Sequence, residues 1–264
     1  MNGEQYREFA RWFTSYVCSF RESDPDHQRN LDLKEQHTAR VGMNMERITR
    51  KLGLSANDQR LAAAIALFHD LGRFPQYRLY RTFRDAISEN HAKLAIRELT
   101  RHRILHTLDP AERRLVGRAI IYHNRFHLPT HLDPQTLLHS RLIRDADKLD
   151  ILRLMAEEFR KPKALQNPVV TFSLAQESAV RDEIYQHLFA QRPMTYEELT
   201  NANEFKVLQM SWAFTLNFRP SFEIMRERDD LDVIAASLPD SSLRDKALAF
   251  VKTYIDRRIA DDPG

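Results

Sequence analysis

Histidine and aspartate residues of the chain occur at positions that suit metal chemistry. They fall in segments expected to be helical, near helix ends or on semi-polar faces, where side chains can converge in the centre of a bundle. The candidate ligands are His37, His69, Asp70, His91, His123 and Asp147. Imidazole nitrogen and carboxylate oxygen suit Zn, Mn, Fe, Co or Ni. The pattern is therefore compatible with a divalent transition metal as cofactor.

The adjacent pair His69-Asp70 follows the apolar run LAAAIALF, which predicts a central buried helix. Neighbouring side chains at its end project about 100° apart, which suits two ligands that approach one ion from different sides. A carboxylate at a helix C-terminus opposes the helix dipole, and burial without a cation is costly. Asp70 therefore needs a positive partner, and either a metal or an arginine would serve.

Single histidines are weak evidence, since most lie on the surface or form a hydrogen bond in the core. His102 and His106 have the i,i+4 spacing that could bind a metal. They lie three or more helical turns beyond His91, so we predict that they are surface residues.

The elements that must position these residues are expected to be helical throughout. Only six glycines occur in 264 residues, which disfavours a sheet-rich fold. Apolar periodicity, with Ser55, Asp109 and Asp133 as N-caps and Gly53 as a C-cap, predicts the helices. Their expected ranges are 6–20, 33–52, 56–70, 91–105, 110–121, 135–159 and 173–189, with further helices separated by Pro193, Pro220 and Pro239.

Other segments are expected to connect these helices. Residues 23–30 are predicted to be a polar connector, 76–85 (QYRLYRTFRD) an arginine-rich loop, and 169–172 a short extended piece. The predicted fold is all-α, a single helical bundle with a C-terminal helical extension. Residues 1–165 would form the metal-binding domain with its N-terminal helix, and 166–264 would pack on it as the extension.

Composition restricts the classes of partner and compartment. The net charge of +3 disfavours nucleic acid as the main partner. No run approaches the roughly 18 apolar residues of a membrane span, and the N-terminus lacks signal-peptide order, so the prediction is a cytoplasmic protein without membrane contact. The single cysteine, Cys18, fits a reducing compartment and is expected to be a small buried hydrophobe.

Three segments in order resemble the HD-domain superfamily of metal-dependent phosphohydrolases. They are KEQHTARVGMNM with His37, AIALFHDLGRF with His69-Asp70, and LIRDADKLDIL with Asp147. The similar span, about 33 to 155, covers a little under half of the chain. The resemblance implies an HD-type helical bundle and hydrolysis by a metal-activated water.

The resemblance also implies a ligand set. His37, His69, Asp70 and Asp147 would hold one ion, and His91 and His123 match positions that supply a second ion in binuclear members. Two ions are favoured over one, with Asp70 as the bridging carboxylate that orients the nucleophile. The related cyclic-dinucleotide phosphodiesterases typically carry paired histidines where this chain has His123-Asn124, and a Gly-Tyr-Pro signature that is absent here. That particular activity is therefore disfavoured.

Basic residues near these motifs are candidates for recognising substrate charge. Arg73 lies where related enzymes often carry a lysine, and Lys148 follows Asp147; both are predicted, with Asp70, to be catalytic. Arg73, Lys148, Arg81, Arg84 and Arg144 are the predicted substrate-binding residues. An arginine fork suits phosphate oxygens, although some of these residues could instead form surface ion pairs. The expected substrate is a small anionic phosphomonoester or phosphodiester, with nucleotides as one candidate class.

Two other functions remain open at this stage. Inositol oxygenases resemble the superfamily in all six ligands yet hold two irons, and the ligand residues cannot separate that chemistry from hydrolysis. A diiron oxygenase acting on a small polar or anionic substrate, such as a phosphonate, is therefore the first alternative. A non-catalytic ligand-sensing module is the second, although the intact ligand residues argue against it. Whether the chain forms a homodimer is also left open.

Overall fold

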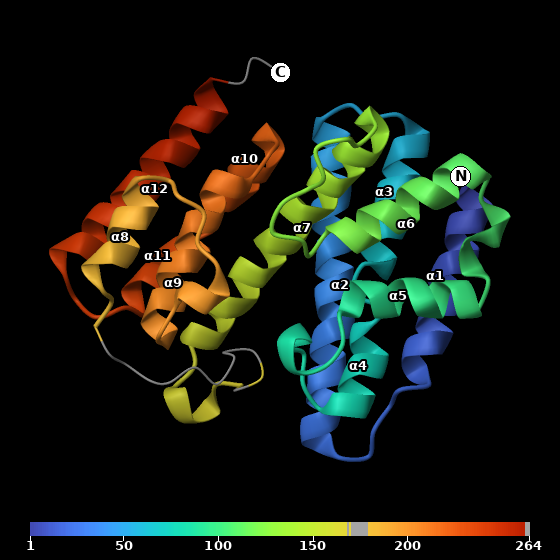
Figure 1. Ribbon diagram of the computed structural model, residues 1–264, viewed down its shortest axis with the longest axis horizontal. Coiled ribbons are helices and arrows are strands. Elements are labelled where there is room, and N and C mark those ends of the chain that lie inside the picture. The colour runs from blue at the N-terminus through green and yellow to red at the C-terminus, as the bar shows by residue number, and fades with distance from the viewer. Residues whose placement is uncertain (168, 170–178, 262–264) are drawn as a thin grey trace. The chain divides into compact units, whose positions relative to one another are not determined.

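The computed structural model describes residues 1–167, 169 and 179–261, and all the secondary structure in these ranges is helical (Figure 1). The all-α prediction is confirmed. The chain divides into two compact units, Met1–Asp147 and Lys148–Gly264. This division falls within helix α7 (Pro134–Phe159), earlier than the expected domain boundary at 165. The expectation that residues 166–264 pack on the same domain stays a prediction.

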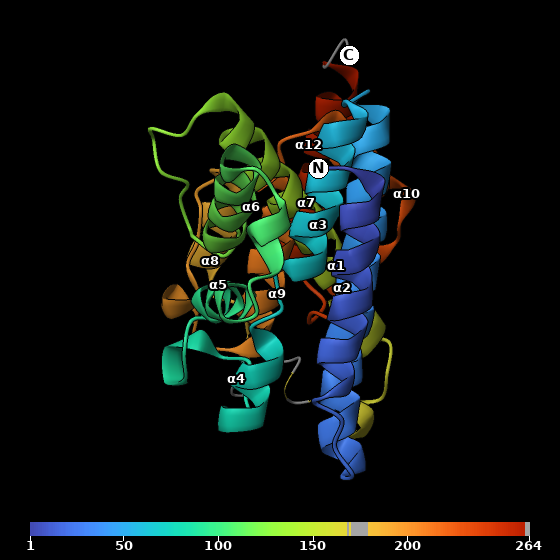
Figure 2. The ribbon, with the colours of Figure 1, turned by 90° about the vertical axis from the view of Figure 1, so that its right-hand side faces the viewer.

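The first unit is built around helix α3, whose C-terminal half is buried on all but one face. Its side chains from Ala62 to Phe68 lie in the core except for Ala63 and Leu67. Helices α1, α2 and α6 pack on α3, and Figure 2 shows α1, α2 and α3 running side by side. The helices of this unit are α1 (Gly3–Cys18), α2 (Pro25–Lys51), α3 (Ala56–Phe68), α4 (Arg73–Tyr80), α5 (His91–Arg101), α6 (Pro110–Tyr122) and the first part of α7, with short 3-10 helices at Asp85–Ile87 and Ile104–Thr107.

The predicted helix ends are largely confirmed. The Ser55 side chain accepts the Asp58 N–H at the start of α3, and Asp109 accepts N–H groups at the start of α6. Asp133 accepts the Thr136 N–H at the start of α7. Gly53 has φ 62° after α2, a left-handed conformation that glycine adopts without a steric penalty.

Two predicted connectors are partly helical. Residues 23–30 were expected to be a connector, but α2 begins at Pro25, with Asp24 as N-cap accepting two backbone N–H groups. Residues 76–85 were expected to be a loop, but α4 extends to Tyr80. Helix α4 buries Phe74, Gln76 and Tyr77 and contacts α2 and α5, so its stability comes from tertiary packing.

The prediction that Cys18 is buried is wrong. The buried face of α1 carries Phe13, Tyr16 and Val17, and Cys18 is exposed at the end of the helix. A step of one residue rotates a helical side chain by about 100°, which takes Cys18 off the apolar face.

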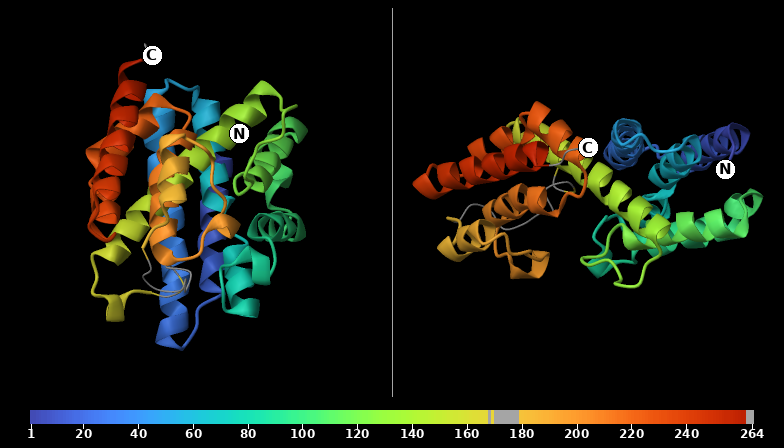
Figure 3. Two further views of the ribbon diagram at one scale, coloured as in Figure 1. Left: turned by 60° about the vertical axis from the view of Figure 1, so that its left-hand side comes forward. Right: turned by 90° about the horizontal axis from the view of Figure 1, so that it is seen from above.

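The second unit is a separate set of helices after the division in α7. Helix α12 contacts α8, α10 and α11, and Figure 3 shows α10 and α12 alongside one another. Its elements are α8 (Asp182–Phe189), α9 (Ala202–Ser211), α10 (Arg219–Glu227), α11 (Asp230–Ala236) and α12 (Ser242–Ala260), with 3-10 helices at Lys163–Leu165, Tyr196–Glu198 and Trp212–Thr215.

The predictions before α8 can be compared with the structure only in part. The extended piece expected at 169–172 and the first part of the helix expected from 173 fall outside the described residues, except Val169, which lies in a turn. Residues 179–181, which were predicted to belong to that helix, are described and are not helical, and α8 begins at Asp182. Among the described residues, no helix has the length and apolar character needed to cross a membrane.

Candidate metal centre

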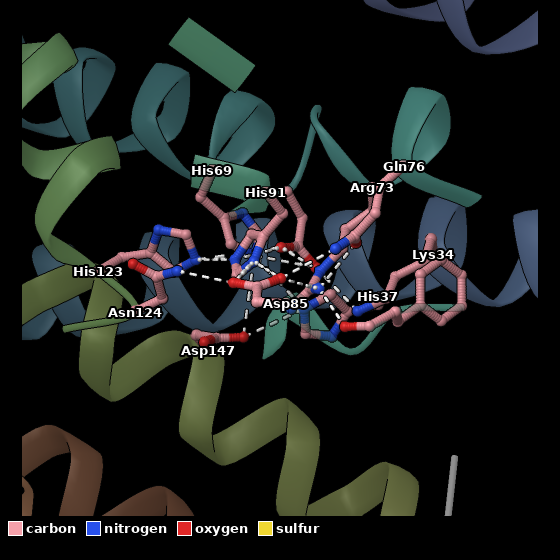
Figure 4. A network of polar contacts seen from close by, with 12 residues as sticks. Lys34, His37, His69, Arg73, Gln76, Asp85, His91, His123, Asn124 and Asp147 are labelled. Atoms are coloured by element: carbon pink, nitrogen blue, oxygen red, sulfur yellow. Dashed lines mark hydrogen bonds and ion pairs between the residues drawn. The ribbon is translucent and has the colours of Figure 1, made fainter. Parts of the chain in front are cut away.

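The structure brings all six predicted ligand residues together within the first unit, and Figure 4 labels the four histidines and Asp147 among them. Asp70 lies in the middle and is buried. Its Oδ2 faces His37 and His69, and its Oδ1 faces His91 and His123. We call His37, His69 and Asp147 the first half-site, and His91 and His123 the second half-site. Asp70 is common to both half-sites.

The first half-site joins side chains from α2, α7 and the end of α3. His37 Nε2 lies 3.6 Å from Asp70 Oδ2 and 3.1 Å from Asp147 Oδ1. His69 Nε2 lies 3.3 Å from His37 Nε2. Asn44, which is buried on α2, donates to the Ala146 carbonyl at 3.0 Å and so ties α7 to α2 beside Asp147.

The second half-site joins the start of α5 to the end of α6. His91 Nε2 lies 3.3 Å from Asp70 Oδ1 and 3.0 Å from His123 Nε2. His123 Nε2 lies 3.9 Å from Asp70 Oδ1. Both half-sites therefore present their histidine Nε2 atoms to a shared carboxylate.

His69 and His123 are oriented by the same local arrangement. Each follows the last residue of its helix, α3 or α6, as the C-cap. Each Nδ1–H donates at 2.7 Å to the carbonyl three residues earlier, of Ala66 or Ile120. The hydrogen bond occupies Nδ1, fixes the ring and leaves Nε2 facing the centre.

Gly72 permits the close approach of the two segments that carry Asp70 and His91. A Cβ atom on residue 72 would lie 2.0 Å from the His91 carbonyl oxygen and 2.7 Å from the Ala95 nitrogen. Any larger residue would push the start of α5 away from the turn after α3. Glycine is therefore required here by space, and it holds the second half-site against Asp70.

Asp85 supports the second half-site, although it was not among the predicted site residues. It accepts hydrogen bonds from His91 Nδ1 at 2.8 Å, Gln76 Nε2 at 2.9 Å and Asn124 Nδ2 at 3.2 Å. Arg73 Nη1 lies 3.0 Å from the same carboxylate. A carboxylate behind a histidine fixes the ring and raises its strength as a ligand. The signal in the sequence was only its proximity to His91.

Burial sets the charge state of the cluster. Burial, reinforced by the Arg73 charge, lowers the pKa of His91 to about 4, and burial with nearby His69 lowers the pKa of His123 to about 4. Burial raises the pKa of Asp70, but the Lys34 and Arg73 charges outweigh this and hold it well below its usual value. At neutral pH His91 and His123 are therefore neutral and Asp70 is ionised, the forms that bind metal.

The arrangement of the two Nε2 atoms in the second half-site fits a bound metal ion. His91 Nδ1 donates to Asp85 and His123 Nδ1 donates to Ile120, so both Nε2 atoms carry lone pairs. Two lone pairs 3.0 Å apart repel each other unless a cation lies between them. Nitrogens bound to one ion at about 2.0–2.1 Å lie about 2.8–3.0 Å apart in octahedral geometry and about 3.3–3.4 Å apart in tetrahedral geometry. The observed separation of 3.0 Å matches a shared ion with octahedral angles.

The predicted basic residues lie in different environments. Arg73 Nε lies 3.3 Å from Asp70 Oδ1, but its Nη1 also donates to Gln76, the Phe83 carbonyl and Asp85. Its guanidinium is therefore largely engaged in holding the site.

Arg144 and Arg81 also have structural partners. The Arg144 guanidinium donates to the carbonyls of Tyr122, His123, Arg125 and Phe126 and so closes the end of α6. Arg81 pairs with Glu22 at 3.0 Å. Half-buried Arg84 and Lys148 lie after α4 and directly after Asp147, respectively. Substrate binding by any of these residues stays a prediction.

Comparison with known proteins finds a match to one family model. The model, described as HD domain, matches residues 35–152, which include all six predicted ligand residues. The searches of curated proteins and of solved structures find no match.

Proposed function

Given that residues 35–152 form an HD domain, we propose that the chain is a metal-dependent phosphohydrolase that holds two divalent ions around Asp70. The substrate is a small phosphomonoester or phosphodiester. The observation that supports the proposal best is the facing pair of Nε2 lone pairs on His91 and His123. It extends the cluster beyond the single ion that His37, His69, Asp70 and Asp147 would hold.

Bound divalent ions would supply an activated water and would neutralise charge on the leaving oxygen. The chain's own contribution is to hold the ligand side chains in the orientation that metal binding needs. Asp70 offers one oxygen to each half-site, at 3.3 Å from His91 and 3.6 Å from His37. The Nδ1 hydrogen bonds of His69 and His123 keep their Nε2 atoms aimed inward, so little reorganisation is needed when metal binds.

Charge near the cluster favours an anionic substrate. Lys34 Nζ lies 2.9 Å from Asp70 Oδ2, and Arg73 Nε lies 3.3 Å from Asp70 Oδ1. With two divalent ions added, the positive charge would exceed that of the two carboxylates, Asp70 and Asp147. A phosphate group would balance this excess in a partly desolvated site.

The test begins with metal analysis of protein purified without chelator. Monoester and diester substrates, including nucleotides, are then assayed with Mn, Fe, Co, Ni and Zn in turn. We expect up to two ions per chain and metal-dependent release of phosphate or of a phosphomonoester. The matched control is Asp58→Asn, which alters an aspartate that contacts a histidine, His139, outside the ligand set.

Other outcomes would separate the alternatives. Two bound irons, no phosphoester cleavage and substrate-dependent consumption of oxygen would replace the proposal with the oxygenase. Metal-free protein that binds phosphate compounds without turnover would replace it with a ligand-sensing role.

A further inference from the structure

Lys34 stands directly beside the first half-site and was not among the predicted residues. It lies on α2 three positions before His37, which places both side chains on one face of the helix. Its Nζ is 2.9 Å from Asp70 Oδ2 and 5.2 Å from the centre of the Phe83 ring. Its side chain is only 13% exposed. A lysine so placed is part of the site rather than of the surface.

The Lys34 ammonium has fewer hydrogen-bond partners in the structure than the nearby arginine guanidinium groups. An ammonium has three N–H donors, and within the described residues Asp70 is the polar partner of Lys34. Arg73, by contrast, donates to Asp70, Asp85, Gln76 and the Phe83 carbonyl. Arg144 donates to backbone carbonyls. Lys34 is therefore the better placed of these cations to receive a new anion.

Metal binding would bring a second cation to the same oxygen. Asp70 Oδ2 faces His37 and His69 as well as Lys34. An ion held by these ligands would compete with the ammonium for Oδ2, because like charges repel strongly in a partly desolvated site. An anionic oxygen bound next to the ammonium would relieve that repulsion.

We propose that Lys34 is a substrate-binding residue that donates to an anionic oxygen of the substrate's phosphate at the first half-site. This inference rests on the proposed function and deepens it. The role differs from that of a lysine that merely neutralises Asp70. A neutralising lysine would stabilise the metal-free fold, whereas a substrate-binding lysine changes affinity for phosphate.

The experiment compares Lys34→Met and Lys34→Arg with wild type, and Lys51→Met serves as control. Lys51 is an exposed lysine at the end of the same helix. Metal content, thermal stability, calorimetric binding of inorganic phosphate to the metal-loaded protein, and kcat and KM are measured for each. For Lys34→Met we expect metal content equal to wild type or higher. We also expect about 10- to 100-fold weaker phosphate binding and a similar rise in KM.

Lys34→Arg should recover part of the phosphate affinity, because it restores the charge with a different donor geometry. Unchanged phosphate affinity and KM in Lys34→Met would overturn the inference. So would metal loss that matches the loss of activity, since that would mark a structural role. Wild-type protein that binds no phosphate would also overturn it. Phosphate binding that depends on Lys34, without any phosphoester cleavage, would contradict the proposed function and leave the anion site standing.

Discussion

The two half-sites share one carboxylate but are held in place by different means. The first half-site takes its ligands from α2, the end of α3 and α7, and adds a second carboxylate, Asp147. The second half-site has two histidines, and its support comes from Asp85, which lies in the segment between α4 and α5. The two half-sites share the backbone hydrogen bonds of His69 and His123, and the second depends in addition on the hydrogen bonds that converge on Asp85.

This difference has a consequence for metal affinity. Asp147 adds a negative charge directly to the first half-site. Asp85 instead contacts His91 Nδ1, on the side of the imidazole ring away from the second half-site. A carboxylate that contacts the cation directly attracts it more strongly than a carboxylate separated from it by an imidazole ring, because the distance is shorter. We therefore expect the first ion to bind more tightly than the second, and the predictions that follow test this order.

The largest effect is expected from Asp70→Ala, because it removes the one residue common to both half-sites. Both ions should be lost on dialysis, and kcat/KM should fall by about 10³-fold or more, since each ion contributes several kcal/mol to transition-state stabilisation. Metal content and turnover are measured against the Asp58→Asn control. Retention of one tightly bound ion would show that Asp70 does not bridge the half-sites.

Asp85→Asn should weaken only the second ion. The variant removes the charge behind His91 but keeps a side chain of the same size, so the affinity for the second ion should fall about 10- to 100-fold. Titration of the metal-free protein should then separate into one tight and one weak step. An equal loss at both steps would mean that the two half-sites are not independently supported.

Arg144→Met tests the position of His123 through the backbone that carries it. Arg144 donates to the His123 carbonyl at 3.2 Å and to the Phe126 carbonyl at 3.2 Å. Without it, these carbonyls lose a charged donor and the end of α6 loosens, so we expect roughly tenfold weaker binding of the second ion. Arg144→Lys should recover part of the affinity, because lysine keeps the charge but not the fork.

The control for Arg144→Met is Arg78→Met. The Arg78 guanidinium also donates to a backbone carbonyl, that of Ser19, and lies 3.9 Å from the centre of the Phe20 ring. Both variants should lose about 1–3 kcal/mol of stability, but only Arg144→Met should change metal affinity. If Arg144→Met instead raises KM with its metal affinity intact, the substrate-binding role expected from the sequence would be favoured.

Sequence reasoning selected six histidine and aspartate residues that the structure brings together, because these residue types carry their chemistry wherever the fold places them. It also found the starts of α6 and α7 from Asp-Pro pairs. It missed the same signal at Asp24-Pro25, where the polar stretch that follows suggested a connector. The apolar residues of that stretch are sparse, and only packing in the unit makes it helical.

The residues that support the ligands were harder to predict. Asp85 reaches His91 only because Arg73, Gln76 and Asn124 converge on it from three other segments. Such convergence depends on long-range packing, which periodicity does not encode. Lys34, by contrast, could have been found from the sequence, since it shares a helix face with His37 at i,i+3 spacing.

The last prediction concerns the acid stability of the metal-free protein. His91 and His123 have pKa values of about 4 in the folded state, chiefly because of burial, against about 6.5 in the unfolded chain. Between these values the unfolded chain binds protons that the folded protein does not. The contribution of these two histidines to the free energy of unfolding is therefore fully present above about pH 6.5. It falls as the pH drops towards 4, by about 1.4 kcal/mol per pH unit for each histidine.

Urea unfolding of chelator-treated protein between pH 7.5 and 4.5 measures this slope. His123→Gln should reduce the slope by about one proton, because a group that the unfolded state would protonate has been removed. His131→Gln, at an exposed histidine, is the matched control and should leave most of the slope in place. An unchanged slope in His123→Gln would mean that His123 accepts a proton in the folded protein as readily as in the unfolded chain. The second half-site would then take up a proton between its two Nε2 atoms below about pH 6.5, and metal would have to displace that proton to bind in acid.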